Sequence, residues 1–133
     1  MWKVCSVLFS VTFLHSIMVT LLYWFLLYPV LNQATQDDPI NVAKHSLPLI
    51  FLIIELLANS MVIESRHIFA VVFFGEIYIA LLICYTLTGD RYIYSVMKLD
   101  SQASWNLLIF INIGVIFFYL ILLGLDKIKF RLL

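Results

Sequence analysis

The sequence predicts an all-α protein that crosses a membrane as a bundle of four helices. Of its 133 residues, 64% are hydrophobic and only 12% are charged, whereas a soluble domain is about half apolar and a quarter charged. Four long apolar runs are separated by charged residues, Pro and Gly. Each run holds roughly the 20 residues that a helix needs to cross a bilayer, and a helix satisfies its own backbone polar groups in lipid.

The first run follows Lys3 and ends before the polar stretch 32–39, and its apolar core is too long for a cleaved signal peptide. The second run stops at Glu64. The third stops at Gly89, a residue that often ends helices, and the fourth stops before the charged tail 126–131. No repeat or linker is visible, so we expect one transmembrane domain over 1–133, with helices at about 4–30, 44–63, 67–88 and 103–125.

The distribution of basic residues predicts that both termini face the cytosol. Short cytosolic loops carry an excess of Lys and Arg. The side that holds the termini and the connection between the second and third runs carries Lys3, Arg66, Lys127, Lys129 and Arg131. The opposite side carries only Lys44, Arg91 and Lys98. We therefore expect an integral protein of the plasma membrane or an endomembrane, oriented with both ends inside.

Composition also limits the partners. Eight Lys and Arg balance eight Asp and Glu, so there is no basic field to bind nucleic acid. The lipid bilayer is the expected partner, and association into a homo- or hetero-oligomer stays open. Cys5 and Cys84 lie near opposite ends of the bundle, too far apart for a disulfide, and are expected to be buried thiols. No metal-ligand spacing is present, and no cofactor is expected.

Four polar residues interrupt the apolar runs: His15, Glu55, Asn59 and Glu76. A charged group near the bilayer centre costs about 2.5–3.5 kcal/mol on insertion scales, so we expect these residues to face inward as one polar layer. Helix rise places His15, Glu55 and Glu76 at similar depths, with Asn59 one turn from Glu55. One interpretation is hydrogen bonding that holds the helices together. The other is a proton relay or a metal site, for which a second His at ligand spacing is missing.

Several short motifs follow one another at the edges of the apolar runs. They are Asn41-Val-Ala-Lys-His45-Ser-Leu-Pro48, Ile54-Glu55-Leu56, Ser65-Arg66-His67, Thr88-Gly89-Asp-Arg-Tyr92-Ile93-Tyr94 and Lys98-Leu99-Asp100. This ordered set resembles the rolling stone and androgen-induced protein family of polytopic membrane proteins. The opening Trp2-Lys3 and the segment from Thr20 to Pro29 resemble the rolling stone branch. The family-matching residues are Asn41, His45, Glu55, Arg66 and Gly89.

The resemblance covers nearly all of this chain but only the later part of the family pattern. The androgen-induced branch of this family contains threonine hydrolases that act within the membrane on fatty-acid esters of hydroxy fatty acids. The resemblance therefore raises the question whether this chain has the residues for that activity. Those enzymes use an early Thr and a His shortly before a Thr-Gly pair. Here Thr88-Gly89 follows Cys84-Tyr-Thr-Leu87 without a His, and the early Thr has no counterpart. We therefore expect no catalytic residue in this chain.

Three functions stay open at this point. The rolling stone branch is associated with myoblast fusion, so the resemblance favours a non-catalytic protein of cell-surface interaction or cell fusion. A lipid-ester hydrolase would need His15 or His45 as a replacement base. A small proton or metal transporter would depend on Glu55 and Glu76.

Overall fold

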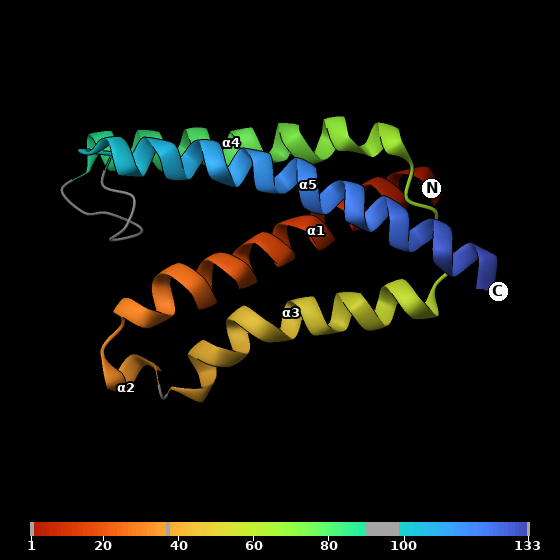
Figure 1. Cartoon of the computed structure of the whole chain (residues 1–133), viewed down its shortest axis with the longest axis horizontal. Helices are drawn as coiled ribbons and strands as arrows, with labels where there is room; N and C mark the ends of the chain where they lie inside the picture. Colours follow the sequence, from red (N-terminus) through yellow and green to blue (C-terminus); the bar gives the residue numbers. More distant parts are fainter. Residues whose placement is uncertain (1, 37, 90–98, 133) are drawn as a thin grey trace.

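The computed structural model describes residues 2–36, 38–89 and 99–132, and within these ranges it is helical with no strand (Figure 1). A π-helical turn η1 and a 3-10 turn η2 continue α1, and a 3-10 turn η3 leads into α4. The all-α fold class is therefore confirmed. The elements are α1 (Trp2–Leu22), η1 (Tyr23–Leu27), η2 (Tyr28–Val30), α2 (Gln33–Gln36), α3 (Pro39–Ala58), η3 (Ser65–His67), α4 (Ile68–Thr88) and α5 (Gln102–Leu132).

Four of the described segments are long and apolar enough to cross a membrane. They are Trp2–Val30, Pro39–Ala58, Ser65–Thr88 and Gln102–Lys129. Each has at least the length that a spanning helix requires. The chain is thus a multi-pass membrane protein of four helices, as its composition predicts.

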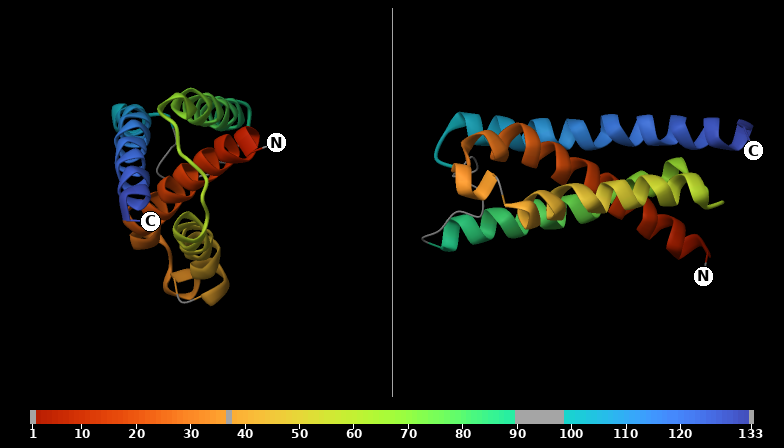
Figure 2. Two further views of the ribbon diagram at one scale, coloured as in Figure 1. Left: turned by 90° about the vertical axis from the view of Figure 1, so that its right-hand side faces the viewer. Right: turned by 90° about the horizontal axis from the view of Figure 1, so that it is seen from below.

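Helix α1 is the centre of the bundle. It contacts α3, α4 and α5, while α4 also contacts α5. Figure 1 shows α1 running obliquely between α3 on one side and α4 and α5 on the other, and Figure 2 shows that α4 and α5 are set apart from each other in the two further views. Both termini lie at the same end of the bundle. This agrees with the expected even number of crossings, and the assignment of that end to the cytosol stays a prediction.

The core lies along α1 and α5 and leaves α3 and α4 largely uncovered. Phe13, Leu14, Val71, Tyr119 and Leu122 are among its most deeply buried side chains. Within the apolar spans, 28% of residues are buried in α1 and in α5, but only 6% in α3 and 11% in α4. Lipid or another protein must therefore cover most of α3 and α4.

Helix α3 begins and ends about five residues before its expected range of 44–63. Asp38 caps it by accepting a hydrogen bond from Ile40 N at 3.0 Å, and Pro39 fits the first turn because that turn leaves its N–H unpaired in any case. At the other end, Asn59 has an extended backbone and its side chain accepts from Met61 N at 3.1 Å. Such local bonding of Asn competes with helix continuation. Residues 59–64 are consequently a connection instead of the last turns of a helix.

Helix α5 continues beyond the expected end at residue 125 and reaches Leu132. From the sequence, the charged residues 126–131 are expected after the end of this helix. Asp126 and Lys129 instead lie buried on the inner side of the helix.

The two cysteines are both free, in agreement with the expectation that they do not pair. Their expected burial is wrong, because Cys5 and Cys84 are both exposed on the outer surface of their helices. A thiol behaves as a small apolar group, so a surface that faces lipid accepts it.

Candidate functional site

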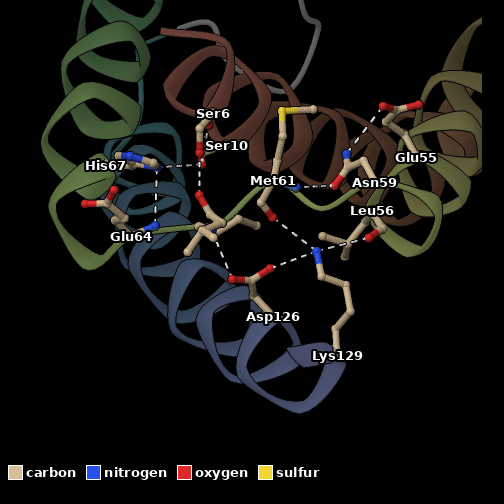
Figure 3. Close-up of polar contacts among 12 residues, drawn as sticks. Ser6, Ser10, Glu55, Leu56, Asn59, Met61, Glu64, His67, Asp126 and Lys129 are labelled. Atoms are coloured by element: carbon tan, nitrogen blue, oxygen red, sulfur yellow. Dashed lines mark hydrogen bonds and ion pairs between the residues drawn. The ribbon is translucent and has the colours of Figure 1, made fainter. Parts of the chain in front are cut away.

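A polar cluster closes the end of the bundle where the termini lie (Figure 3). Lys129 Nζ lies 3.1 Å from Asp126 Oδ1 and donates hydrogen bonds to the carbonyl oxygens of Leu56 at 3.3 Å and Met61 at 3.1 Å. Asp126 Oδ2 accepts from Ile63 N at 3.0 Å. The pair therefore binds the backbone at both the end of α3 and the connection that follows it.

Asp126 and Lys129 form hydrogen bonds with backbone groups that otherwise have no partner among the described residues, at the end of α3 and in the connection after it. The last carbonyls of a helix have no partner within the helix, and an ammonium group near them is favoured by the helix dipole. A buried ion pair is stable only when further hydrogen bonds compensate for its lost hydration. Here the backbone groups of residues 56, 61 and 63 provide them.

A second set of contacts fixes the start of α4. Glu64 and His67 form a capping box around η3, and His67 Nδ1 lies 3.1 Å from Ser10 Oγ of α1. Tyr119 Oη donates to Glu64 O at 2.6 Å. Ser6 Oγ donates to Val62 O. The connection between α3 and α4 is thus held from both α1 and α5.

Arg66, which the sequence analysis singled out, is exposed and forms an ion pair with Glu64. This guanidinium lowers the pKa of the Glu64 carboxyl below its ordinary value of 4.5, because the hydrogen bond and the positive charge favour the ionised form. Another residue singled out there, Gly89, ends α4 with its N–H bonded to Tyr85 O at 3.0 Å. Residues 90–98 of the same motifs lie outside the described residues.

At the opposite end of α3, two residues that the sequence analysis singled out, Asn41 and His45, contact Tyr23 of η1. The His45 ring stacks on the Tyr23 ring, with centroids 3.9 Å apart and planes 7° apart. Asn41 Nδ2 donates to Tyr23 Oη at 2.9 Å, and Thr20 Oγ1 donates to His45 O at 2.7 Å. These contacts fix the position of the His45 ring between α1 and α3.

Beside His45 lies a cavity of about 310 Å³ between α1, η1, α3, α4 and α5. Its walls are mainly apolar, and its polar lining residues are His15, Tyr23, His45, Tyr78 and Asn112. His15 Nε2 and His45 Nδ1 are buried and have no hydrogen-bond partner among the described residues. An unpaired buried polar atom costs about 1–3 kcal/mol, so the cavity holds two groups that are incompletely satisfied.

The expected inward-facing polar layer of His15, Glu55, Asn59 and Glu76 is not formed. Glu55 is exposed in the last turn of α3, where it accepts from Asn59 Nδ2 at 3.3 Å. Its expected depth was wrong because α3 ends at Ala58, which moves Glu55 close to the end of its helix. Glu76 is exposed on α4. Only His15 of this set lines the cavity.

Sequence reasoning missed Asp126, Lys129 and His67 as buried polar residues. No local signal marked His67, because Glu64 and His67 are not the Ser or Thr and the Glu or Gln of the usual capping-box pattern, although they form that geometry here. The described residues contain no group of three or more His, Cys, Asp or Glu that could hold a metal ion.

Comparisons with protein-family models, with curated proteins and with solved structures found no match.

Proposed function

We propose that this protein is a non-catalytic membrane protein that associates with itself or with another membrane protein, in cell-surface interaction or cell fusion. One observation carries the proposal, namely an exposed carboxyl group near the middle of a spanning helix. Glu76 lies eight residues from Ile68 and twelve from Thr88, the ends of α4. At about 1.5 Å per residue, it is roughly 12 Å from one end and 18 Å from the other.

Within the part of the chain that the structure describes, the carboxyl group of Glu76 has no partner. It is exposed, and no hydrogen bond or ion pair from the described residues reaches it. A charged group at this depth costs about 2.5–3.5 kcal/mol when it faces lipid. A neighbouring helix with a hydrogen-bond donor removes the carboxyl from lipid and pairs it.

The surface around Glu76 fits a helix interface. We define the outer face of α4 as Phe69, Phe73, Glu76, Ala80 and Leu87, all of which are exposed. Their spacing of three, four and seven residues places them on one stripe of the helix. Small Ala80 beside Glu76 would let a second backbone approach closely, as membrane helix interfaces require.

The ordered motifs of the rolling stone resemblance support the cellular role. A cell-mixing assay tests it, in which two cell populations each express the protein together with one half of a split reporter. We expect the native protein to raise the reporter signal, and Glu76→Leu to lower it at equal surface expression. Glu55→Leu, which changes an exposed carboxyl at the end of α3, is the matched control. A native protein without effect, or a fully active Glu76→Leu variant, contradicts the proposal.

A lipid-ester hydrolase is the second candidate, and the two imidazoles at one apolar cavity favour it. His15 and His45 both line the cavity, and a neutral imidazole is a suitable general base. Hydrolysis through a covalent intermediate also needs a nucleophile beside the base, and the described lining contains no Ser, Thr or Cys. Turnover of fatty-acid esters of hydroxy fatty acids by the purified protein, lost in His15→Ala or His45→Ala, would favour this candidate.

A proton or metal transporter is the third. Glu55 and Glu76, on which it depended, are on the outer surface instead of inside the bundle. The geometry therefore supports it least.

A further inference from the structure

The cavity between α1, η1, α3, α4 and α5 is separate from the outer face of α4 and has the properties of a ligand site. Its volume of about 310 Å³ falls within the range of about 300–1,000 Å³ of small-molecule pockets. The rare π-helical turn η1 supplies Tyr23, Leu26 and Leu27 to its wall, and such turns are frequent at functional sites.

The hydrogen bond that His15 Nδ1 forms determines which kind of group can pair with the other ring nitrogen, Nε2. His15 Nδ1 lies 2.7 Å from Val11 O. A carbonyl oxygen can only accept, so Nδ1 carries the hydrogen, and Nε2 of the neutral ring carries a lone pair. His15 is one of the residues that line the cavity, and its Nε2 is buried beside Gly75 of α4, another lining residue, with no hydrogen-bond partner among the described residues. The missing group must therefore be a hydrogen-bond donor.

His45, another residue that lines this cavity, supplies a second ring nitrogen without a hydrogen-bond partner among the described residues. Its Nδ1 is also buried and unpaired among the described residues, and its ring is held by the stack on Tyr23. A ligand with a hydroxyl group can pair with either tautomer of this ring, since a hydroxyl both donates and accepts.

The rest of the lining limits the charge of the ligand. The described lining contains no Lys, Arg, Asp or Glu, so a charged ligand would lose its hydration without compensation. Ketones, ethers and esters offer only acceptors, which would face the lone pair of His15 Nε2. We propose that the cavity binds an uncharged, lipid-soluble alcohol, whose hydroxyl donates to His15 Nε2.

The test is competition with a photoreactive long-chain alcohol that carries a diazirine in its chain, added to the purified full-length protein in detergent. We expect labelled peptides from the cavity lining. Hexadecanol should compete about tenfold better than hexadecyl methyl ether, because the ether lacks the donor and leaves Nε2 unpaired. Labelling elsewhere only, no saturable labelling, or equal competition by the two compounds overturns the proposal.

Two variants connect the preference to His15. His15→Phe keeps a ring but removes the acceptor, so the alcohol and the ether should compete equally well. Gly75→Ala should weaken labelling, because its added Cβ would lie 3.4 Å from His15 Nε2. Gly124→Ala is the control, since a Cβ there meets nothing within 4 Å. A preference for the alcohol that survives in His15→Phe contradicts the proposal, and neither result depends on association through α4.

Discussion

Lys129 near the end of α5 donates a hydrogen bond to the carbonyl of Leu56, 73 residues earlier, at 3.3 Å. The same ammonium group pairs with Asp126 at 3.1 Å, whose carboxylate binds Ile63 N. One turn of α5 thus holds the end of α3 and the connection to α4. The charged end of this chain is a structural part of the bundle.

Removing the ammonium group should destabilise the bundle strongly. We expect Lys129→Met to lower the free energy of unfolding by about 3–5 kcal/mol, because it leaves Asp126 buried without its counter-charge. Unfolding in mixed detergent micelles, followed by circular dichroism, measures the change. Lys127→Met alters an exposed charge on the same helix and should change the stability by less than about 0.5 kcal/mol. Equal effects of the two variants would show that the buried pair does not hold the connection.

Tyr119 gives a second test of the connection between α3 and α4. The side chain is fully buried and its hydroxyl donates to Glu64 O at 2.6 Å. Tyr119→Phe should cost about 0.5–1.5 kcal/mol, because the Glu64 carbonyl loses one of two donors and keeps the N–H of His67, while the ring still fills its place. The exposed Tyr85 offers the control Tyr85→Phe, for which no comparable loss is expected in the same unfolding experiment.

The ion pair of Glu64 and Arg66 predicts a pH dependence. Because Arg66 lowers the pKa of Glu64 below 4.5, the ionised carboxylate contributes stability above this ordinary value and loses it as the pH falls through the lowered pKa. Arg66→Gln should return the pKa of Glu64 toward its ordinary value. A titration of the Glu64 carboxyl carbon by NMR in micelles measures it, and an unchanged pKa would exclude Arg66 as the cause.

The sequence was sufficient for the number of spans because composition alone decides which segments are stable in lipid. It did not show which face of α4 is buried, since almost every residue of that helix is apolar and lipid accepts apolar side chains as well as a core does. The only reason to place Glu76 on the inner face was the free energy that a charged carboxyl costs when it faces lipid. The expected range of α3 was also about five residues too late, because the local hydrogen bonds of Asp38 and Asn59, which set its two ends, were not recognised.

The buried pair of Asp126 and Lys129 could not be predicted from local pattern. Charges that follow an apolar run are usually solvated, and their burial here depends on carbonyls more than 60 residues away in sequence. The same is true of the cavity, because its two imidazoles come from α1 and α3 and line one cavity only because those helices pack together.

Site-specific photocrosslinking in native membranes decides whether a second copy of this chain or another membrane protein covers the outer face of α4 at Glu76. Benzophenone is attached at Ala80→Cys, one turn from Glu76, in a chain carrying Cys5→Ser and Cys84→Ser. We expect a discrete protein adduct of defined mass that is lost in Glu76→Leu and retained in Glu76→Gln, which can still form hydrogen bonds. Adducts with lipid only, or a protein adduct unchanged by Glu76→Leu, would contradict the proposed association.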